Sequence, residues 1–237
     1  MILPRLLDWI YPPRCTLCET PLNNGRHLCQ TCSHQLPRLN NNRCLTCAHQ
    51  LEGPVGLQPQ CPNCQTLKPA FDFANASLLG TAHVIDLIHR FKLQGQVELA
   101  RDLAPFLVDT FRSDSRFTQL ANPLLIPVPL HPRRQRERKY NQAHELTRFT
   151  AKLLDINSQN LLRRTAFKPR QATLTRKQRL QNLHNAFTPK SPKTNLKNRD
   201  LILIDDVLTT GSTLHECARA LRSGKPRTIA VLTVVRA

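Results

Sequence analysis

Eight of the nine cysteines form four C-x-x-C pairs near the start of the 237-residue chain. Two thiolates separated by two residues can bind one tetrahedral Zn²⁺, and a second pair completes a site of four cysteine ligands that is closed to substrate. The simplest pairing is sequential, and an interleaved pairing is the alternative. In the sequential scheme one ion is bound by Cys15, Cys18, Cys29 and Cys32, and the other by Cys44, Cys47, Cys61 and Cys64. The spacing predicts two structural zinc ions in successive zinc ribbons.

Disulfide bonds and a redox-active centre are the alternative uses of such pairs. The opening stretch MILPRLLDWIYPPRC has early prolines and only short apolar runs, so it predicts neither a secretion signal nor a membrane helix. The expected location is the cytoplasm, where cysteine pairs are more often metal ligands than disulfides. The pairs lie among turn-forming residues, which disfavours a redox centre beside a βαβ unit. Cys217 stands alone in a predicted helix and is expected to be a buried apolar residue.

A second chemical motif is LILIDDVLTTGST at 201–213. Small and hydroxyl-bearing residues after the aspartates can surround an anion with N–H groups and hydroxyls, and the following helix adds its N-terminal dipole. The two carboxylates would repel a phosphate, so they are expected to accept hydrogen bonds from neutral hydroxyls of the same ligand or to face Mg²⁺. A sugar phosphate meets both demands. The predicted binding residues are Asp205, Asp206, Thr209, Thr210, Gly211, Ser212 and Thr213.

Alternating strands and helices must position this motif. Apolar runs predict strands at 74–80, 123–130, 201–204 and 228–235. Amphipathic spacing predicts helices at 83–93, 96–111, 141–154 and 212–224. This order predicts right-handed crossovers and therefore an α/β fold, a mostly parallel sheet flanked by helices. Ligands of such sheets bind beyond the carboxyl ends of the strands, where the two aspartates are expected.

The chain is expected to divide into two parts. Residues 1–68 predict a double zinc ribbon, which is too small to rely on an apolar core of its own. Residues 69–237 predict the α/β domain.

Positive charge is concentrated in one segment. The formal net charge is +18, and residues 131–199 carry 18 Lys and Arg against three Asp and Glu. Such a field attracts polyanions, so nucleic acid or a phosphorylated small molecule is an expected partner. A solvated basic face is the alternative.

The LILIDDVLTTGST motif resembles the phosphoribosyl-pyrophosphate (PRPP) signature of type I phosphoribosyltransferases. Three further stretches extend the resemblance over most of the chain: HRFKLQG at 89–95, IPVPLHPRRQRERKYNQA at 126–143 and RQATLTRKQRLQNLHNAF at 170–187. With the four cysteine pairs in front, the chain is similar to the ComF/GntX family, whose competence members serve natural transformation.

This resemblance implies roles for individual residues. Asp205 and Asp206 would bind the ribose hydroxyls of PRPP, and Thr209 to Thr213 its 5′-phosphate. The loop around 129–134 would bind pyrophosphate with Mg²⁺, and the basic segment 163–187 would form a mobile hood over the site. The candidates for the pyrophosphate are Pro129, Arg133, Arg134 and Lys92.

The sequence departs from the family at one position. Family members commonly read RGFNQ where this chain has RKYNQ at 138–142. Lys139 therefore replaces a glycine that reaches positive φ easily, which puts the backbone shape of this loop in question. No catalytic acid or base stands out, because His131 and His144 near the loop are more simply explained as structural residues.

Three functions compete. The family resemblance favours a DNA-uptake protein that handles incoming single-stranded DNA in the cytoplasm, keeps a PRPP site and has the uptake machinery at the inner face of the membrane as a candidate partner. The alternative is an active phosphoribosyltransferase with an unidentified acceptor. A role for the ribbons in transcription or as a docking platform rests on the zinc module alone. The candidate DNA-binding residues are Arg170, Arg176, Lys177 and Arg179.

Overall fold

The structure of the chain, a computed structural model, describes residues 13–22, 25–51, 61–66, 68–166, 183, 185–191 and 195–237. Its centre is a four-stranded sheet with the order β1-β6-β5-β2, in which every neighbouring pair is parallel. The strands are β1 (Phe73–Leu79), β2 (Leu124–Pro127), β5 (Asp200–Leu208) and β6 (Thr228–Arg236). All four strands therefore end at the same edge, and the predicted α/β fold is confirmed.

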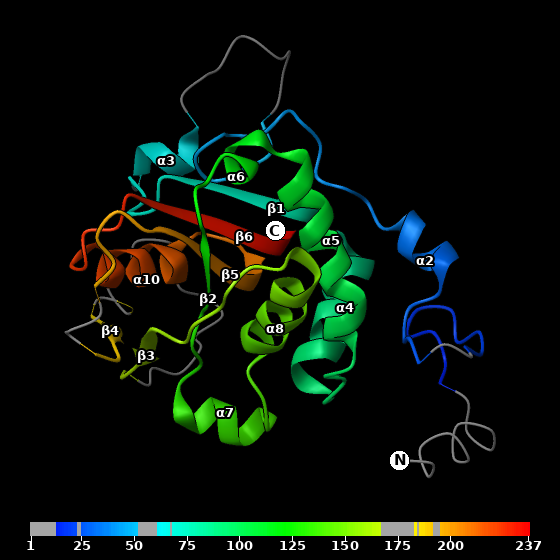
Figure 1. Cartoon of the computed structure of the whole chain (residues 1–237). Helices are drawn as coiled ribbons and strands as arrows, with labels where there is room; N and C mark the ends of the chain where they lie inside the picture. Colours follow the sequence, from blue (N-terminus) through cyan, green and yellow to red (C-terminus); the bar gives the residue numbers. More distant parts are fainter. Residues whose placement is uncertain are drawn as a thin grey trace.

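Both faces of the sheet are covered, because successive residues of the strands point to opposite sides. Ile202 and Ile204 of β5 pack on the face that holds three helices, while Leu201 and Leu203 pack on the other face. The three helices are α4 (Ala82–Leu93), α5 (Leu99–Ser113) and α8 (Gln142–Leu154). The opposite face is covered by α10 (Ser212–Arg222) (Figure 1). Apolar residues on both sides explain why β5 and β6 read as continuous hydrophobic runs.

Shorter elements occupy the connections. α6 (Ser115–Thr118) follows α5, and α7 (Pro132–Arg138) follows β2. β3 (Leu162–Arg164) and β4 (Phe187–Pro189) form an antiparallel pair beside α10. This pair joins the two ends of the basic segment that was predicted to be a hood.

Several predicted boundaries differ from the structure. The strand expected at 201–204 continues to Leu208, because β5 pairs with β6 along its whole length. The helix expected from residue 96 begins at Leu99, since a turn with a hydrogen bond from Val97 N to Gly95 O precedes it. The loop expected at 129–134 contains the start of α7, which Pro132 opens at a position that suits proline.

The two edges of the sheet are not bare. Residues 37–39 run beside β1, where Leu39 N donates to Ser77 O and Leu79 N donates to Pro37 O. Residues 157–159 run beside β2, where Leu125 hydrogen-bonds to both ends of that short segment. Edge strands expose unpaired backbone groups, and these two segments satisfy part of them.

The cysteine-rich region forms two separate ribbons. The first includes α2 (Gln30–Gln35) and lies against α5, while the second includes α3 (Pro62–Thr66) and lies near the ends of β1 and β6 (Figure 1). Cys15 of the first ribbon belongs to the apolar cluster on the three-helix face, whereas Ala48 of the second belongs to the cluster on the α10 face. In the part of the chain that the structure describes, every helix is too short or too polar to span a bilayer.

Candidate functional site

Asp205 and Asp206 lie inside β5, close to its carboxyl end. Asp206 is 4% exposed, Asp205 is half-buried, and the Asp206 N–H donates to Asp205 Oδ1 over 2.9 Å. Loss of hydration, followed by the charge of Asp206, raises the pKa of Asp205 to about 8. Two adjacent acids in this environment favour one shared proton or a nearby cation.

A cation from another element neutralises the second acid. Lys92 Nζ on α4 lies 2.9 Å from Asp206 Oδ2, and both side chains are largely buried. The charge of Lys92 also lowers the pKa of Asp205, although this effect is smaller than the loss of hydration. Lys92 was predicted as a pyrophosphate candidate, and the structure brings it to the acid pair.

The segment after α7 holds the end of α4 in place. Tyr140 Oη donates to the carbonyl of Phe91, and Gln142 Nε2 donates to the carbonyl of Lys92 over 3.5 Å. Sequence reasoning missed this contact, although both residues belong to the stretch 126–143 that supported the family resemblance. Their partners lie about 50 positions earlier in the chain, so local pattern could not reveal them.

Lys139, which stands where family members commonly have glycine, has a backbone conformation that glycine adopts easily. Lys139 is the C-cap of α7 and adopts φ 67° in the left-handed region, which glycine would enter without a Cβ clash. His131 Nδ1 accepts from Arg133 N and caps the other end of α7, which agrees with its expected structural role.

The predicted phosphate loop connects β5 to α10. Gly211 has φ +77°, so its left-handed conformation, and not a lack of space, requires glycine there. Thr210 Oγ1 lies 2.9 Å from Ser212 Oγ, and Ser212 and Thr213 open α10. The loop therefore gathers hydroxyls and backbone N–H groups at the positive end of a helix, an arrangement suited to a phosphate.

The predicted pyrophosphate loop begins on the strand next to the aspartates. β2 pairs with β5, and Val128 N donates to Ile204 O, so the residues after β2 leave the sheet beside Asp205. Pro129 lies in this loop, and Arg133 and Arg134 lie on α7. Arg133 is exposed and pairs along its own helix with Glu137 at 3.4 Å.

The base of the basic segment is anchored to α10. Asn185 N donates to Glu216 Oε2, and Arg219 on the same helix contacts both Glu216 and the side chain of Asn185. The segment therefore leaves and returns beside the helix that follows the phosphate loop. The candidate DNA-binding residues Arg170, Arg176, Lys177 and Arg179 lie outside the described residues. Cys217, also on α10, is fully buried as expected.

The cysteines form two clusters, and the pairing is sequential. In each cluster the four sulfurs lie within 4.8 Å of one another. Cys44 Sγ lies 3.8 Å from Cys64 Sγ, and Cys47 Sγ lies 3.5 Å from Cys61 Sγ. A tetrahedron with Zn–S bonds of about 2.3 Å has edges of about 3.8 Å, so the geometry fits zinc. Burial raises the pKa of Cys47 to about 12, which a bound divalent cation would offset by stabilising the thiolate. The clusters fit two structural zinc ions.

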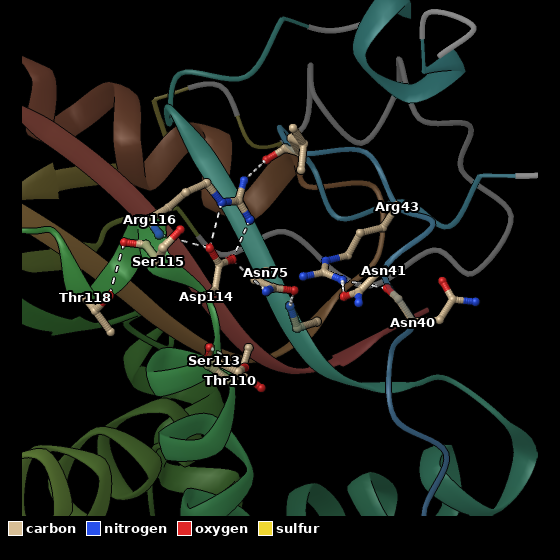
Figure 2. A network of polar contacts seen from close by, with 12 residues as sticks. Asn40, Asn41, Arg43, Asn75, Thr110, Ser113, Asp114, Ser115, Arg116 and Thr118 are labelled. Carbon is tan, nitrogen blue, oxygen red and sulfur yellow. Dashed lines mark hydrogen bonds and ion pairs between the residues drawn. The ribbon is translucent and has the colours of Figure 1, made fainter. Parts of the chain in front are cut away.

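A partly buried ion pair fixes the second ribbon to the α/β domain. Arg116 on α6 contacts Asp114 at 2.6 Å and donates to the carbonyl of Leu45 between the first two cysteines of that ribbon. Asn75 of β1 donates to the same Asp114 carboxylate over 2.8 Å (Figure 2). Strand and helix therefore share one carboxylate, and Arg116 connects it to the ribbon.

Comparison with known proteins gives two matched domains. A double zinc ribbon domain matches residues 6–65, and a phosphoribosyl transferase domain matches residues 145–237. Three relatives cover most of the chain. Competence protein F of Haemophilus influenzae is 36% identical, over 94% of this chain and 97% of its own length. The DNA utilization protein YhgH of Escherichia coli is 30% identical, over 89% and 91%, and the competence protein ComFC of Bacillus subtilis is 26% identical, over 91% and 86%.

The extent of these matches decides the assignment. The ribbons and the parallel sheet follow one another in the order that the two matched domains require. With similarity of this extent along nearly its whole length, the chain belongs to the ComF/GntX family of competence proteins, built from a double zinc ribbon and a phosphoribosyltransferase-like α/β domain.

Proposed function

We propose that this chain handles incoming single-stranded DNA during natural transformation and binds PRPP, with Mg²⁺, at the carboxyl end of β5. The observation that carries the PRPP site is the acid pair, Asp205 and Asp206, next to a hydroxyl-rich loop at the start of α10. The DNA role is supported by the printed names of the relatives, competence protein and DNA utilization protein. The proposed location is the cytoplasm, at the inner face of the membrane beside the uptake machinery.

The roles within the site follow from its chemistry. The two aspartates would accept hydrogen bonds from the ribose hydroxyls, and the residues from Thr209 to Thr213 would donate to the 5′-phosphate. Lys92 would balance negative charge on Asp206 until Mg²⁺ and the pyrophosphate enter, with Pro129, Arg133 and Arg134 on the pyrophosphate side. Mg²⁺ would supply charge neutralisation for the pyrophosphate.

The PRPP site is tested by isothermal titration of PRPP with Mg²⁺. Asp205→Asn combined with Asp206→Asn should weaken binding strongly, because each lost charge-assisted hydrogen bond costs about 1.5–3 kcal/mol. The matched control, Asp86→Asn with Asp109→Asn, removes two exposed carboxylates from α4 and α5 and should bind like the parent. Unchanged binding by the first double variant would mean that the site is wrongly assigned.

The DNA role is tested by fluorescence anisotropy with single-stranded oligonucleotides at several salt concentrations. Replacing Arg176, Lys177 and Arg179 by alanine should weaken binding to every sequence and reduce the salt slope by roughly 0.7 per lost phosphate contact. The control replaces three exposed cations elsewhere, namely Arg112, Lys152 and Lys197. Equal losses in both variants would point to net charge and not to the basic segment.

The alternative function is catalysis, the transfer of phosphoribose from PRPP to an unidentified acceptor. The match to a phosphoribosyl transferase domain over residues 145–237 supports it. In such a transfer the protein mainly positions the ligand and stabilises the departing pyrophosphate. Pyrophosphate release in the presence of nucleobases separates the two functions, because a protein that only binds PRPP should not release pyrophosphate.

A further inference from the structure

One arginine joins the second ribbon to the start of the phosphate loop. Arg236, the last residue of β6, is 5% exposed and stands opposite Leu208 in the sheet register. Its Nη1 donates to Leu208 O over 2.9 Å, and its Nη2 lies 3.2 Å from His49 Nδ1. A guanidinium has donors only, so His49 must accept with Nδ1 and carry its proton on Nε2.

Leu208 is the residue from which the phosphate loop leaves the sheet. Its carbonyl also accepts from Ala237 N over 3.1 Å, so two donors fix the last peptide of β5. Ala48 of the second ribbon is fully buried and packs in the same apolar cluster as Leu208 and Phe71. The position of this ribbon and the position of the loop are therefore linked by packing as well as by hydrogen bonds.

The ribbon and the loop also share one hollow. Its lining includes Cys47 and Asn63 of the second ribbon, the residues from Thr209 to Gly211, and Arg236. The first ribbon has a different place, because it packs against α5 on the opposite face of the sheet.

We propose that the second cysteine cluster, acting through His49 and Arg236, holds the phosphate loop in its binding conformation, so that metal occupancy of this cluster sets the loop's affinity for a phosphate group. Arg236 is a positioning residue, since its described contacts reach the loop through Leu208. The identity of the ligand rests on the proposed PRPP site, whereas the coupling between ribbon and loop does not.

The physical reason lies in the composition of the loop. Short side chains and a left-handed Gly211 leave it with much conformational freedom, and a phosphate must order whatever is not ordered beforehand. Fixing Leu208 removes part of that entropy before the ligand arrives. Losing the metal would free the backbone around Cys47, withdraw His49 and remove one acceptor from the buried guanidinium.

The test uses the full zinc-loaded chain and two measurements. Hydrogen–deuterium exchange of the ligand-free protein reports on residues 208–213, and titration with PRPP and Mg²⁺ reports on affinity. His49→Ala and Arg236→Gln should each speed exchange in this segment and raise Kd about threefold to tenfold, the equivalent of one lost hydrogen bond. The double variant should lose less binding free energy than the sum of the losses in the two single variants, because both changes break the same contact. Arg236→Lys should recover part of the affinity.

Controls separate this coupling from general effects. His34→Ala changes an exposed histidine of the first ribbon, and Arg112→Gln removes an exposed charge from α5, so both should match the parent. Cys64→Ser should remove one zinc ion and speed exchange at 208–213, whereas Cys18→Ser should remove one ion and leave that segment unchanged. Zinc content and circular dichroism verify that the other variants remain folded.

Two results would overturn the proposal. One is unchanged exchange at 208–213 in the His49→Ala and Cys64→Ser variants, and the other is an equal effect of Cys18→Ser. If the parent itself fails to bind PRPP, the proposed function fails, and exchange in the ligand-free protein still decides whether the ribbon controls the loop.

Discussion

Asp205 illustrates how ligand binding can conflict with stability at one residue. Its carboxyl group loses hydration beside Asp206, and both effects raise its pKa to about 8. A group whose pKa is higher in the folded than in the unfolded chain stabilises the fold fully only below its unfolded pKa, and this contribution is lost as the pH rises through the folded pKa. Near neutral pH Asp205 ionises more readily in the unfolded chain than in the folded one, and this difference lowers the free energy of unfolding of the ligand-free protein.

Asp205→Asn should stabilise the ligand-free protein in a pH-dependent way. The amide stays neutral and can still accept from Asp206 N, so the free energy of unfolding should exceed that of the parent at pH 7–8. The difference should shrink as the pH falls and disappear well below about pH 4, where both chains carry a neutral side chain in either state. Urea unfolding at several pH values measures this, and a loss of stability that is equal at every pH would contradict it.

Lys139 adopts a backbone conformation in the left-handed region, with φ 67°. A side chain in the left-handed region costs roughly 1–2 kcal/mol, and the extra freedom of glycine in the unfolded chain offsets part of the gain from removing it. Lys139→Gly should therefore raise the free energy of unfolding by about 0.5–1 kcal/mol. The control Arg136→Gly, inside α7, should lower it by about 1 kcal/mol. Equal effects of the two changes would show that the backbone conformation of Lys139 is unstrained.

At the scale of single residues, sequence spacing predicted the metal-binding cysteines, because the members of each pair lie close together in the chain. The C-x-x-C spacing predicted two sites of four cysteines but left the sequential and the interleaved pairing open, and the clusters in the structure show that the pairing is sequential. The roles of Arg236 and Tyr140 were not predictable, because each acts on a carbonyl that the chain brings near only after the sheet has formed.

Among the elements, apolar runs located the strands and helices but not all of their ends. The aspartates of β5 were expected beyond the strand, because two acids interrupt its apolar run. Cross-strand hydrogen bonds with β6 and the buried Lys92 make them acceptable inside it. The β3–β4 pair was not predicted, since two three-residue strands give too short a signal for periodicity.

The contact between α6 and the second ribbon can be tested by removing Arg116. Arg116→Met removes the guanidinium that lies over the Phe73 ring, and it leaves Asp114 without its contacting cation and the Leu45 carbonyl without this donor. Breaking such a pair should lower the free energy of unfolding by about 2–4 kcal/mol.

The pH dependence of this loss identifies its source. Although burial opposes it, contact with Arg116 contributes to a lowered pKa of Asp114, so the stabilisation is present above the ordinary pKa of aspartate and is lost as the pH falls through the lowered value. The difference in the free energy of unfolding between Arg116→Met and the parent should therefore become smaller below about pH 4. The control Arg90→Met breaks an exposed pair with Asp86 and should change stability by less than about 1 kcal/mol. Similar losses in both variants would argue against a special role for the pair of Arg116 and Asp114.

On the scale of the whole molecule, the two ribbons should respond to metal loss independently. The parent should hold close to two zinc ions, and Cys15→Ser with Cys18→Ser should hold close to one, because the clusters share no ligand. Elemental analysis gives the count, and hydrogen exchange shows which ribbon has lost protection. A parent without zinc and with oxidised thiols would overturn the assignment of both clusters.

The segment between the ribbons has a consequence for any attempt to work with the α/β domain by itself. Residues 37–39 cover the outer side of β1 through hydrogen bonds to Ser77 and Leu79. A chain cut before residue 69 would lack this cover and present a strand edge on which another molecule could add its own strand. Such a fragment should self-associate with rising concentration in sedimentation experiments while the full chain keeps its size. The N-terminal region would therefore protect the α/β domain against aggregation by covering the edge of β1, in addition to binding metal ions.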